Sequence, residues 1–134
     1  MNEKHNDATH NRPQGARTID APGVKIDLHA FTEQIKSEDA WQKSDRNSIT
    51  VFKTDDMRIV LGALHKGAEM LPHKAEGIMS IQVIDGAIEV NTDELSETIS
   101  AGQMVAIHKD CNYRVVATEE TTYLLTMSKV HAAI

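Results

Sequence analysis

The sequence has few aromatic residues, a single cysteine and no long apolar stretch, and each scarcity excludes a class of protein. Aromatic residues make up 4% of the 134 residues, so the core has to be built mainly from aliphatic side chains and methionine. Cys111 is the only cysteine, which rules out an internal disulfide and fits a reducing compartment. No apolar run approaches the ~20 residues that a membrane-spanning helix needs. What remains is a small globular protein with an aliphatic core.

Positive charge is also scarce. The chain carries 14 Lys and Arg residues against 20 Asp and Glu residues, a formal net charge of -6. Binding to nucleic acid or to an anionic membrane depends on clustered cations, so neither partner is expected. The first residues, "MNEKHNDATHNRPQGAR", lack the apolar segment of a secretory signal, and we therefore expect a cytoplasmic protein.

The length fits one domain preceded by a tail. Residues 1–23 are polar, contain Pro13 and Pro22, and show no hydrophobic period, which predicts a flexible N-terminal arm or an extended strap. Residues 24–134 are predicted to form the single domain.

One amphipathic helix is predicted near the start of this domain, over about residues 28–42. The side chain of Asp27 can cap its first turn, and Ser37 is the candidate point for a break. The apolar residues that recur at helical spacing are Leu28, Phe31 and Ile35.

From about residue 48 to about residue 129 the sequence changes to short β-prone runs separated by turn residues. The runs are "SITVF", "MRIVLGAL", "GIMSIQVI", "AIEV", "SETI", "QMVAI", "YRVVA" and "TTYLLTM". Seven or eight short strands predict an all-β domain, either an antiparallel sandwich or a small barrel. The clearest hairpin turn is Asp85-Gly86, because this pair tolerates the positive φ angles of a tight turn.

Residues 67–86, "GAEMLPHKAEGIMSIQVIDG", resemble the first motif of the cupins, small β-barrels of the jelly-roll type. That motif runs glycine, five residues, histidine, one residue, histidine, three or four residues, glutamate, six residues, glycine. Gly67, His73 and Gly86 match it. Ala75 stands at the position of the second histidine, and Met79 stands at the position of the glutamate.

The second cupin motif runs glycine, five residues, proline, one residue, glycine, two residues, histidine, three residues, asparagine, and it can be placed on "GQMVAIHKDCNYRVVA". Gly102 matches the first glycine, and Tyr113 stands at the histidine. The remaining motif positions are occupied by His108, Asp110 and Ala117. The resemblance covers roughly residues 50–128 and implies a cupin-like jelly-roll barrel, a double-stranded β-helix, behind the helix and the arm. It also implies a homodimer, as do the exposed sheet edges of such a barrel.

The ligand positions of the two motifs do not predict a metal site. Zinc, iron, nickel and manganese need three or four nitrogen, oxygen or sulfur donors, and the imidazole of His73 is one donor. Ala75, Met79 and Tyr113 occupy the other three positions. We therefore expect no metal and no other cofactor.

Five residues are the candidates for binding a ligand. Side chains alternate between the two faces of a strand, so one set is expected to point into the barrel. This set consists of His73, Ala75, Met79 and Ile81, with Tyr113 facing them from a later strand. Most of the expected pocket is apolar.

Three functions are compatible with such a pocket. The first, which the sequence favours, is a binding module that holds an unidentified small molecule without changing it. The second is a metal-free isomerase or epimerase, with His73 as the base and Tyr113 as the acid across the pocket. The third is a metal enzyme with an unusual ligand set drawn from His65, His73 and His108.

Overall fold

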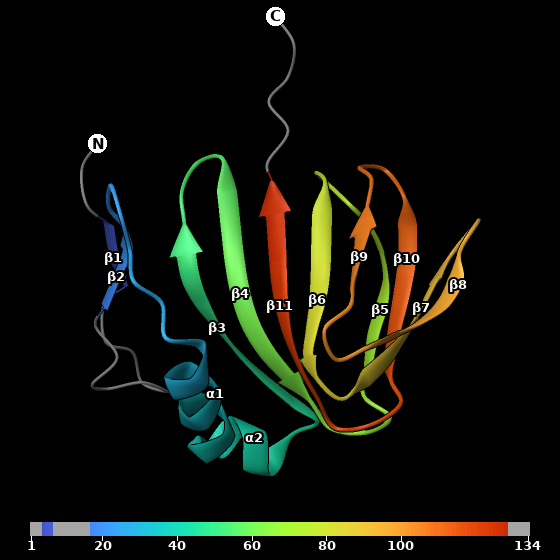
Figure 1. Ribbon diagram of the computed structural model, residues 1–134, viewed down its shortest axis with the longest axis horizontal. Helices are drawn as coiled ribbons and strands as arrows, with labels where there is room; N and C mark the ends of the chain where they lie inside the picture. Colours follow the sequence, from blue (N-terminus) through green and yellow to red (C-terminus); the bar gives the residue numbers. More distant parts are fainter. Residues whose placement is uncertain (1–3, 7–16, 129–134) are drawn as a thin grey trace, which may run out of the picture.

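Two antiparallel β-sheets face each other and form most of the molecule (Figure 1). The computed structural model describes residues 4–6 and 17–128, and for residues 4–6 and 71–73 it describes the backbone alone. The first sheet has five strands, in the order β3 (Arg46–Lys53), β4 (Met57–Leu64), β11 (Thr121–Ser128), β6 (Met79–Asp85) and β9 (Met104–Ile107). The second sheet has four, in the order β5 (Glu69–Lys74), β10 (Asn112–Ala117), β7 (Ala87–Thr92) and β8 (Ser96–Ser100). From β4 onward the chain crosses repeatedly between the sheets, as in the jelly-roll barrel predicted from the sequence.

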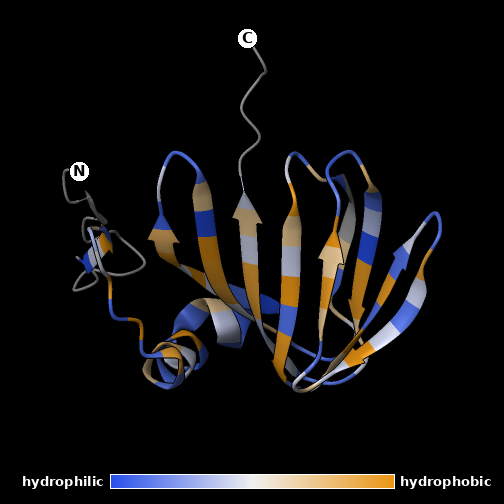
Figure 2. Cartoon of the chain, turned by 45° about the horizontal axis from the view of Figure 1, so that its top comes forward, coloured by the Kyte–Doolittle hydropathy of each residue, from blue (hydrophilic) through white to orange (hydrophobic). Residues whose placement is uncertain are grey.

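Aliphatic side chains at alternating strand positions fill the space between the sheets (Figure 2). In β6, Met79, Ile81 and Val83 are buried, while the residues between them face outward. Val90 of β7 and Val115 of β10 are 0% exposed and meet them from the opposite sheet. The core is therefore aliphatic, as the composition predicted.

The lower part of this core contains one aromatic ring that lies very close to the backbone of a neighbouring strand. Tyr123 of β11 is directly opposite Gly62 of β4 in the strand register. A Cβ atom on Gly62 would collide with the ring of Tyr123, so only glycine leaves room for it. Both residues are buried.

Two short helices cover the outer face of the five-stranded sheet, where one helix over residues 28–42 was predicted. They are α1 (Leu28–Ser37) and α2 (Asp39–Lys43), and the break falls at Glu38, whose backbone is extended (φ -81, ψ 152). The carboxylate of Asp27 accepts a hydrogen bond from the backbone N–H of Ala30, which confirms the predicted cap. Neither helix of the described residues has the length and apolar character needed to cross a membrane.

A second core lies beneath these helices. Ile35 of α1 is 0% exposed and Trp41 of α2 is buried. They pack against a set of side chains on the outer face of β3 and β4, namely Ile49, Val51, Leu61 and Ala63. Strands β3 and β4 are therefore covered on the outside by helices, and their inner face is left to line the space between the sheets.

The last part of the predicted arm or strap is extended and lies against the sheet. Strand β2 (Arg17–Asp20) pairs with β1 (Lys4–Asn6), and Ile19 is buried. The guanidinium group of Arg17 donates a hydrogen bond to the carbonyl of Thr50 in β3. The burial of Ile19 and the hydrogen bond to the Thr50 carbonyl at the edge of the sheet hold this segment in place. The predicted flexibility of residues 1–3 and 7–16 lies outside the described residues.

Turns occupy the positions that the motif resemblance assigned to glycine. Gly86 (φ 92) joins β6 to β7, and Gly67 and Gly102 also have positive φ angles. The hairpin predicted at Asp85-Gly86 is wrong, because β6 and β7 lie in different sheets and are not paired, and only Gly86 of this pair has a positive φ. Asp110 stands where the second motif has a glycine, and at φ 63 it is the one non-glycine residue with positive φ in the described part of the chain. Aspartate is among the residues that tolerate this conformation best. The backbone thus supports the motif alignment even where side chains differ.

Strand β5 was not predicted from the sequence. It contains Pro72, which cannot donate a hydrogen bond and therefore argues against a strand in the interior of a sheet. Strand β5 is an edge strand, paired only with β10 among the described strands, so proline is tolerated there. Ala75, which we expected within a strand, lies just after β5, where its backbone pairs with Asp110 and Cys111.

Candidate functional site

A cavity of about 890 Å³ opens between the two sheets. Its lining runs from Arg46 and Glu69, the first residues of β3 and β5, to the loops that follow these two strands. Those loops lie at the upper ends of the strands (Figure 1). Its described lining consists of Arg46, Lys53, Thr54, Asp55, Met57, Arg58, Glu69, Met70, Lys74, Ala75, Glu76, Gly77, Met79, Tyr113, Leu125, Met127 and Ser128. A volume of this size is within the range of small-molecule sites.

The inner wall of the cavity is apolar. Met79 of β6, Leu125 and Met127 of β11 and Met70 of β5 line it and pack on the barrel core. The small side chain of Ala75 leaves space at the upper end, although the residue itself is buried. Methionine adapts its shape at little energetic cost, so this wall can accommodate ligands of different outlines.

Tyr113 of β10 is a polar group at this apolar wall. Burial raises the pKa of the Tyr113 hydroxyl above its ordinary value of 10.0. The phenol therefore stays neutral at physiological pH and offers one O–H donor and an acceptor oxygen. It is placed to hold a polar group of a ligand whose remainder lies on the methionines.

His73 is described by its backbone alone, so the position of its imidazole lies outside the described side chains. Its Cα is paired with that of Tyr113, because β5 and β10 are neighbours in the same sheet. An acid and a base on opposite walls of the pocket were predicted for the isomerase hypothesis. The register corrects this arrangement, since it places the two backbones side by side on one wall.

Three further candidates lie elsewhere in the fold. Ile81 is 1% exposed and belongs to the closed part of the core, away from the described lining of the cavity. The ring of His65 stacks on Trp41 at 3.5 Å between centroids, and its Nε2 atom is 3.0 Å from the carbonyl oxygen of Trp41. His108 is exposed and follows β9 at the other end of the barrel. The ligand set of His65, His73 and His108 is therefore not brought together, because its first and last members lie at opposite ends.

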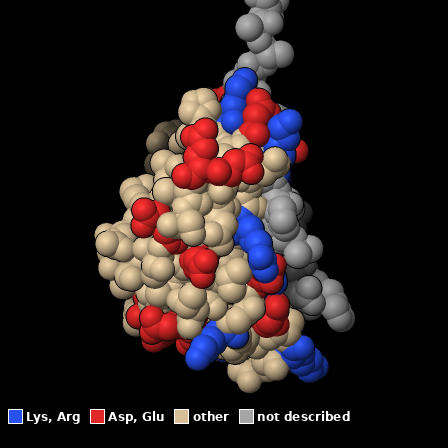
Figure 3. Space-filling view, turned by 90° about the vertical axis from the view of Figure 1, so that its right-hand side faces the viewer, with Lys and Arg blue, Asp and Glu red and all other residues tan. Residues whose placement is uncertain are grey.

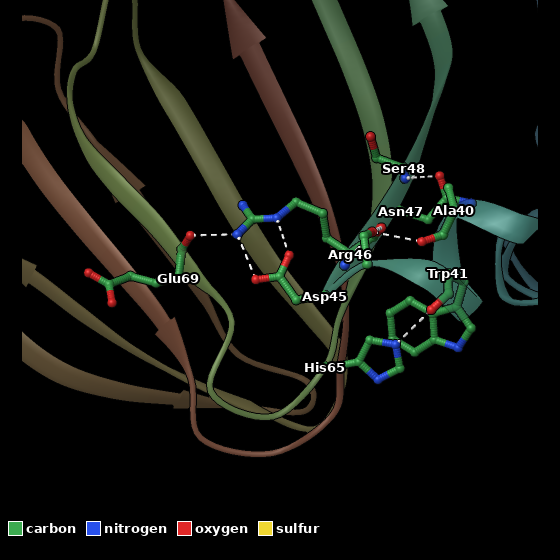
Figure 4. Close-up of polar contacts among 9 residues, drawn as sticks. Ala40, Trp41, Asp45, Arg46, Asn47, Ser48, His65 and Glu69 are labelled. Carbon is green, nitrogen blue, oxygen red and sulfur yellow. Dashed lines mark hydrogen bonds and ion pairs between the residues drawn. The ribbon is translucent and has the colours of Figure 1, made fainter.

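The lower end of the cavity carries paired charges (Figure 4). The guanidinium of Arg46 donates hydrogen bonds to the carboxylate of Asp45, at 2.9 and 3.3 Å, and to the carbonyl of Glu69 at 2.8 Å. This hydrogen bond from Arg46 lowers the pKa of Asp45. Arg114 donates to the carboxylate of Glu69 at 2.6 Å and lowers the pKa of that group in the same way. Arg46, the cation that lines this end, therefore has a carboxylate partner, whereas Arg114 is outside the described lining.

The upper end carries three cations that sequence reasoning missed. Lys53 of β3 and Arg58 of β4 are directly opposite each other in the register, and Lys74 comes from β5 in the other sheet. Lys53, Arg58 and Lys74 take part in no ion pair within the described part of the chain. The Lys and Arg residues for which an ion pair is observed are Lys36, Lys43, Arg46 and Arg114. The turn residues "TDD" at positions 54–56 were the available signal, because a hairpin there brings Lys53 and Arg58 together.

The cavity differs in charge from the outer surface of the barrel. Four cationic and three acidic residues line it, and the carboxylate of one of them, Glu69, is paired with Arg114, whereas the chain as a whole has a net charge of -6. On the side that carries β7 and β8, acidic side chains are scattered over a mostly uncharged surface, with some basic side chains among them (Figure 3). The exposed acids of these two strands and their turn are Glu89, Asp93, Glu94 and Glu97. The cavity is thus a local region of positive charge.

The side chains at the motif positions do not fit the metal that many cupins hold. Ala75 offers only a methyl group. Met79 offers a thioether, which is a soft donor with little affinity for hard divalent ions. No group of three or more histidine, cysteine, aspartate or glutamate side chains suited to an ion occurs among the described residues. We derive no chemistry through a metal at this site.

Comparison with solved structures shows the same fold in other proteins. A conserved protein of unknown function from Streptococcus pyogenes matches with a TM-score of 0.64 and 22% sequence identity, covering 85% of this chain and 93% of that one. A cupin-2 domain containing protein from Shewanella frigidimarina matches with a TM-score of 0.63 and 15% identity, covering 78% and 94%. KdgF from Halomonas sp. matches with a TM-score of 0.59 and 24% identity, covering 65% and 82%.

No family model matches the sequence, and the search of curated proteins found no match. Identities of this size carry information about architecture and none about activity. The structural matches and the sheet topology agree with the motif resemblance: the chain has the cupin fold, the double-stranded β-helix.

Proposed function

We propose that this protein is a small-molecule-binding module whose ligand occupies the cavity between the sheets. The observation that carries the proposal is the cavity itself, about 890 Å³ with a wall of methionine and leucine side chains and the Tyr113 hydroxyl at its upper part. Ligand sites in proteins have this combination of an apolar wall and a few polar groups. The ligand gains from apolar burial, and Tyr113 orients it.

Binding of the neutral dye N-phenyl-1-naphthylamine tests this proposal, because its fluorescence rises in an apolar site. We expect saturable binding at one site per chain. Met127→Trp should fill the upper part of the cavity and weaken binding about tenfold or more, equivalent to about 1.4 kcal/mol.

Met104→Trp is the matched control, since Met104 is 56% exposed and does not line the cavity. Its affinity for the dye should equal that of the unmodified protein. Equal binding by the Met127→Trp variant, with its fold intact by circular dichroism, would place the dye outside the cavity and contradict the proposal.

A homodimer is proposed for the assembly. Strands β5, β8 and β9 are edge strands of their sheets among the described strands, and unpaired edges favour association with a second chain. Light scattering at tens of micromolar should give the mass of a dimer. A monomer mass at that concentration would contradict this proposal and leave the binding proposal untouched.

A further inference from the structure

We propose that the upper end of the cavity is a subsite for the carboxylate of a small organic acid. This inference rests on the proposed function of the cavity as a binding site and names the chemical class of its ligand. The acid places its apolar body against Met70, Met79 and Leu125, and its carboxylate lies among Lys53, Arg58 and Lys74.

The first argument is the register of β3 and β4. Lys53 and Arg58 are directly opposite each other, and both line the cavity, so their side chains share one face of the sheet. Like charges in a directly opposed pair repel and reduce the stability of the pairing. An anion between them replaces this repulsion with two attractions. The fold therefore keeps an arrangement that is unfavourable without a ligand.

The second argument is the contrast with Arg46, the remaining cation of the cavity lining. Arg46 is bonded to the carboxylate of Asp45 at 2.9 Å. Among the described residues, Lys53, Arg58 and Lys74 take part in no ion pair. Because Lys74 belongs to the opposite sheet, the three cations surround the opening from two sides.

The third argument concerns the charge of the ligand. Asp55 and Glu76 also line the upper end, so three cations face two acids. This balance favours a ligand with one negative charge over a dianion, because the two acids would repel a dianion more strongly. The guanidinium of Arg58 matches the two oxygens of a carboxylate in a bidentate geometry, with a lysine at its side. A monocarboxylate satisfies both the charge and the geometry.

A matched pair of dyes tests the subsite. 8-Anilinonaphthalene-1-sulfonate has the aryl body of N-phenyl-1-naphthylamine with one added sulfonate, which takes the place of the carboxylate. Arg58→Gln and Lys53→Gln should each weaken binding of the anionic dye about fivefold, the size expected for one charge partly screened by water. Both variants should bind the neutral dye as the unmodified protein does.

Lys43→Gln is the control, because Lys43 lies in α2, is exposed, and pairs with Asp39 at 3.9 Å outside the cavity. It should bind both dyes unchanged. If the neutral dye binds while Arg58→Gln and Lys53→Gln leave the anionic dye unaffected, the carboxylate subsite is wrong and the binding module stands. If neither dye binds the unmodified protein, the proposed function itself fails.

Competition separates a carboxylate from a phosphate. Octanoate should displace the anionic dye from the unmodified protein at lower concentration than octyl phosphate does, and Arg58→Gln should reduce this advantage. Displacement at lower concentration by octyl phosphate would overturn the assignment to a monocarboxylate.

Discussion

The two ends of the barrel use similar residues in different ways. At the lower end, Tyr123 lies against Gly62 and is 6% exposed, and Arg46 is bonded to Asp45. At the upper end, Tyr113 is half-buried at a cavity wall, and Lys53 and Arg58 have no carboxylate partner among the described residues. The lower end pairs its charges within the fold, whereas the cations at the upper end can pair with a ligand.

This difference separates the residues that hold the fold from those that can serve a ligand. Replacing a residue at the lower end disturbs packing or an existing hydrogen bond, so the expected effect is on the free energy of unfolding. Replacing a residue at the upper end removes a potential contact to a ligand, so the expected effect is on binding. Substitutions at the two ends therefore test the division directly.

Gly62→Ala should cause the largest loss of stability of any of these substitutions. The new Cβ atom would collide with the ring of Tyr123, which is enclosed by the core and cannot move aside freely. We expect the free energy of unfolding to fall by about 3 kcal/mol in urea denaturation.

Gly23→Ala is the matched control, because a Cβ atom at Gly23 would meet nothing within 4 Å. Its unfolding free energy should change by no more than about 0.5 kcal/mol. A similar loss in both variants would mean that the lower end has no special packing requirement.

The two tyrosines should ionise differently, and the sequence contains no others. Burial raises the pKa of Tyr123 from 10.0 to about 12 and raises that of Tyr113 by less. In each variant, Tyr113→Phe and Tyr123→Phe, the absorbance of phenolate reports the remaining tyrosine alone. Tyr123 should titrate at the higher pH.

The same pKa shift predicts a loss of stability in alkali. Folding favours the neutral phenol of Tyr123, so its contribution is complete below pH 10 and is lost as the pH rises toward 12. The loss amounts to about 2–3 kcal/mol for two pKa units. Tyr123→Phe should remove most of this pH dependence and Tyr113→Phe little of it. Equal effects would contradict the difference between the two ends.

The sequence predicted the fold well because the fold depends on local signals. The cap at Asp27 follows from neighbouring residues, and "MRIVLGAL" matches β4 residue for residue. The hairpin predicted at Asp85-Gly86 was wrong, because β6 and β7 belong to different sheets, which no local signal reveals. Strand β5 was missed because Pro72 is unfavourable in most strands, and its tolerance depends on an edge position that only the sheet order reveals.

The site was predicted less completely because it depends on contacts between distant strands. Ala75, Met79 and Tyr113 line the cavity, as their motif positions suggested, but their role in binding stays a prediction. Lys53 and Lys74 come from different sheets, and no sequence pattern indicates that they flank one opening. Lys53, Arg58 and Lys74 are solvent-exposed, as charged residues at strand ends normally are, and only the register and the sheet order reveal that they lie at one opening.

Asp45→Asn should make the lower end of the cavity resemble the upper end. The change removes the carboxylate that neutralises Arg46, while the hydrogen bond from Arg46 to the Glu69 carbonyl can persist. Because Arg46 lines the cavity, the anionic dye should bind about twofold more tightly, a small effect because the group is near water. Asp39→Asn, which unpairs Lys43 on the exposed surface of α2, should leave the affinity unchanged. No difference between the two variants would show that the dye does not sense the lower end.

Removal of metal should have the smallest effect of all. At the upper end, Ala75, Met79 and Tyr113 present a methyl group, a thioether and a neutral phenol, which are poor ligands for zinc or nickel. A metal bound by the native state alone would raise the melting temperature. Because we expect no such metal here, EDTA should leave the melting temperature unchanged.

The combined change Ala75→His, Met79→Glu and Tyr113→His supplies three donors to the same cavity. Zinc should then raise the melting temperature if hydrogen bonds orient the new imidazoles. Elemental analysis of the unmodified protein checks the expectation that it binds no metal. About one equivalent of bound metal would overturn the assignment of this end to an organic ligand, because the cavity would then hold an ion that the described donors do not account for.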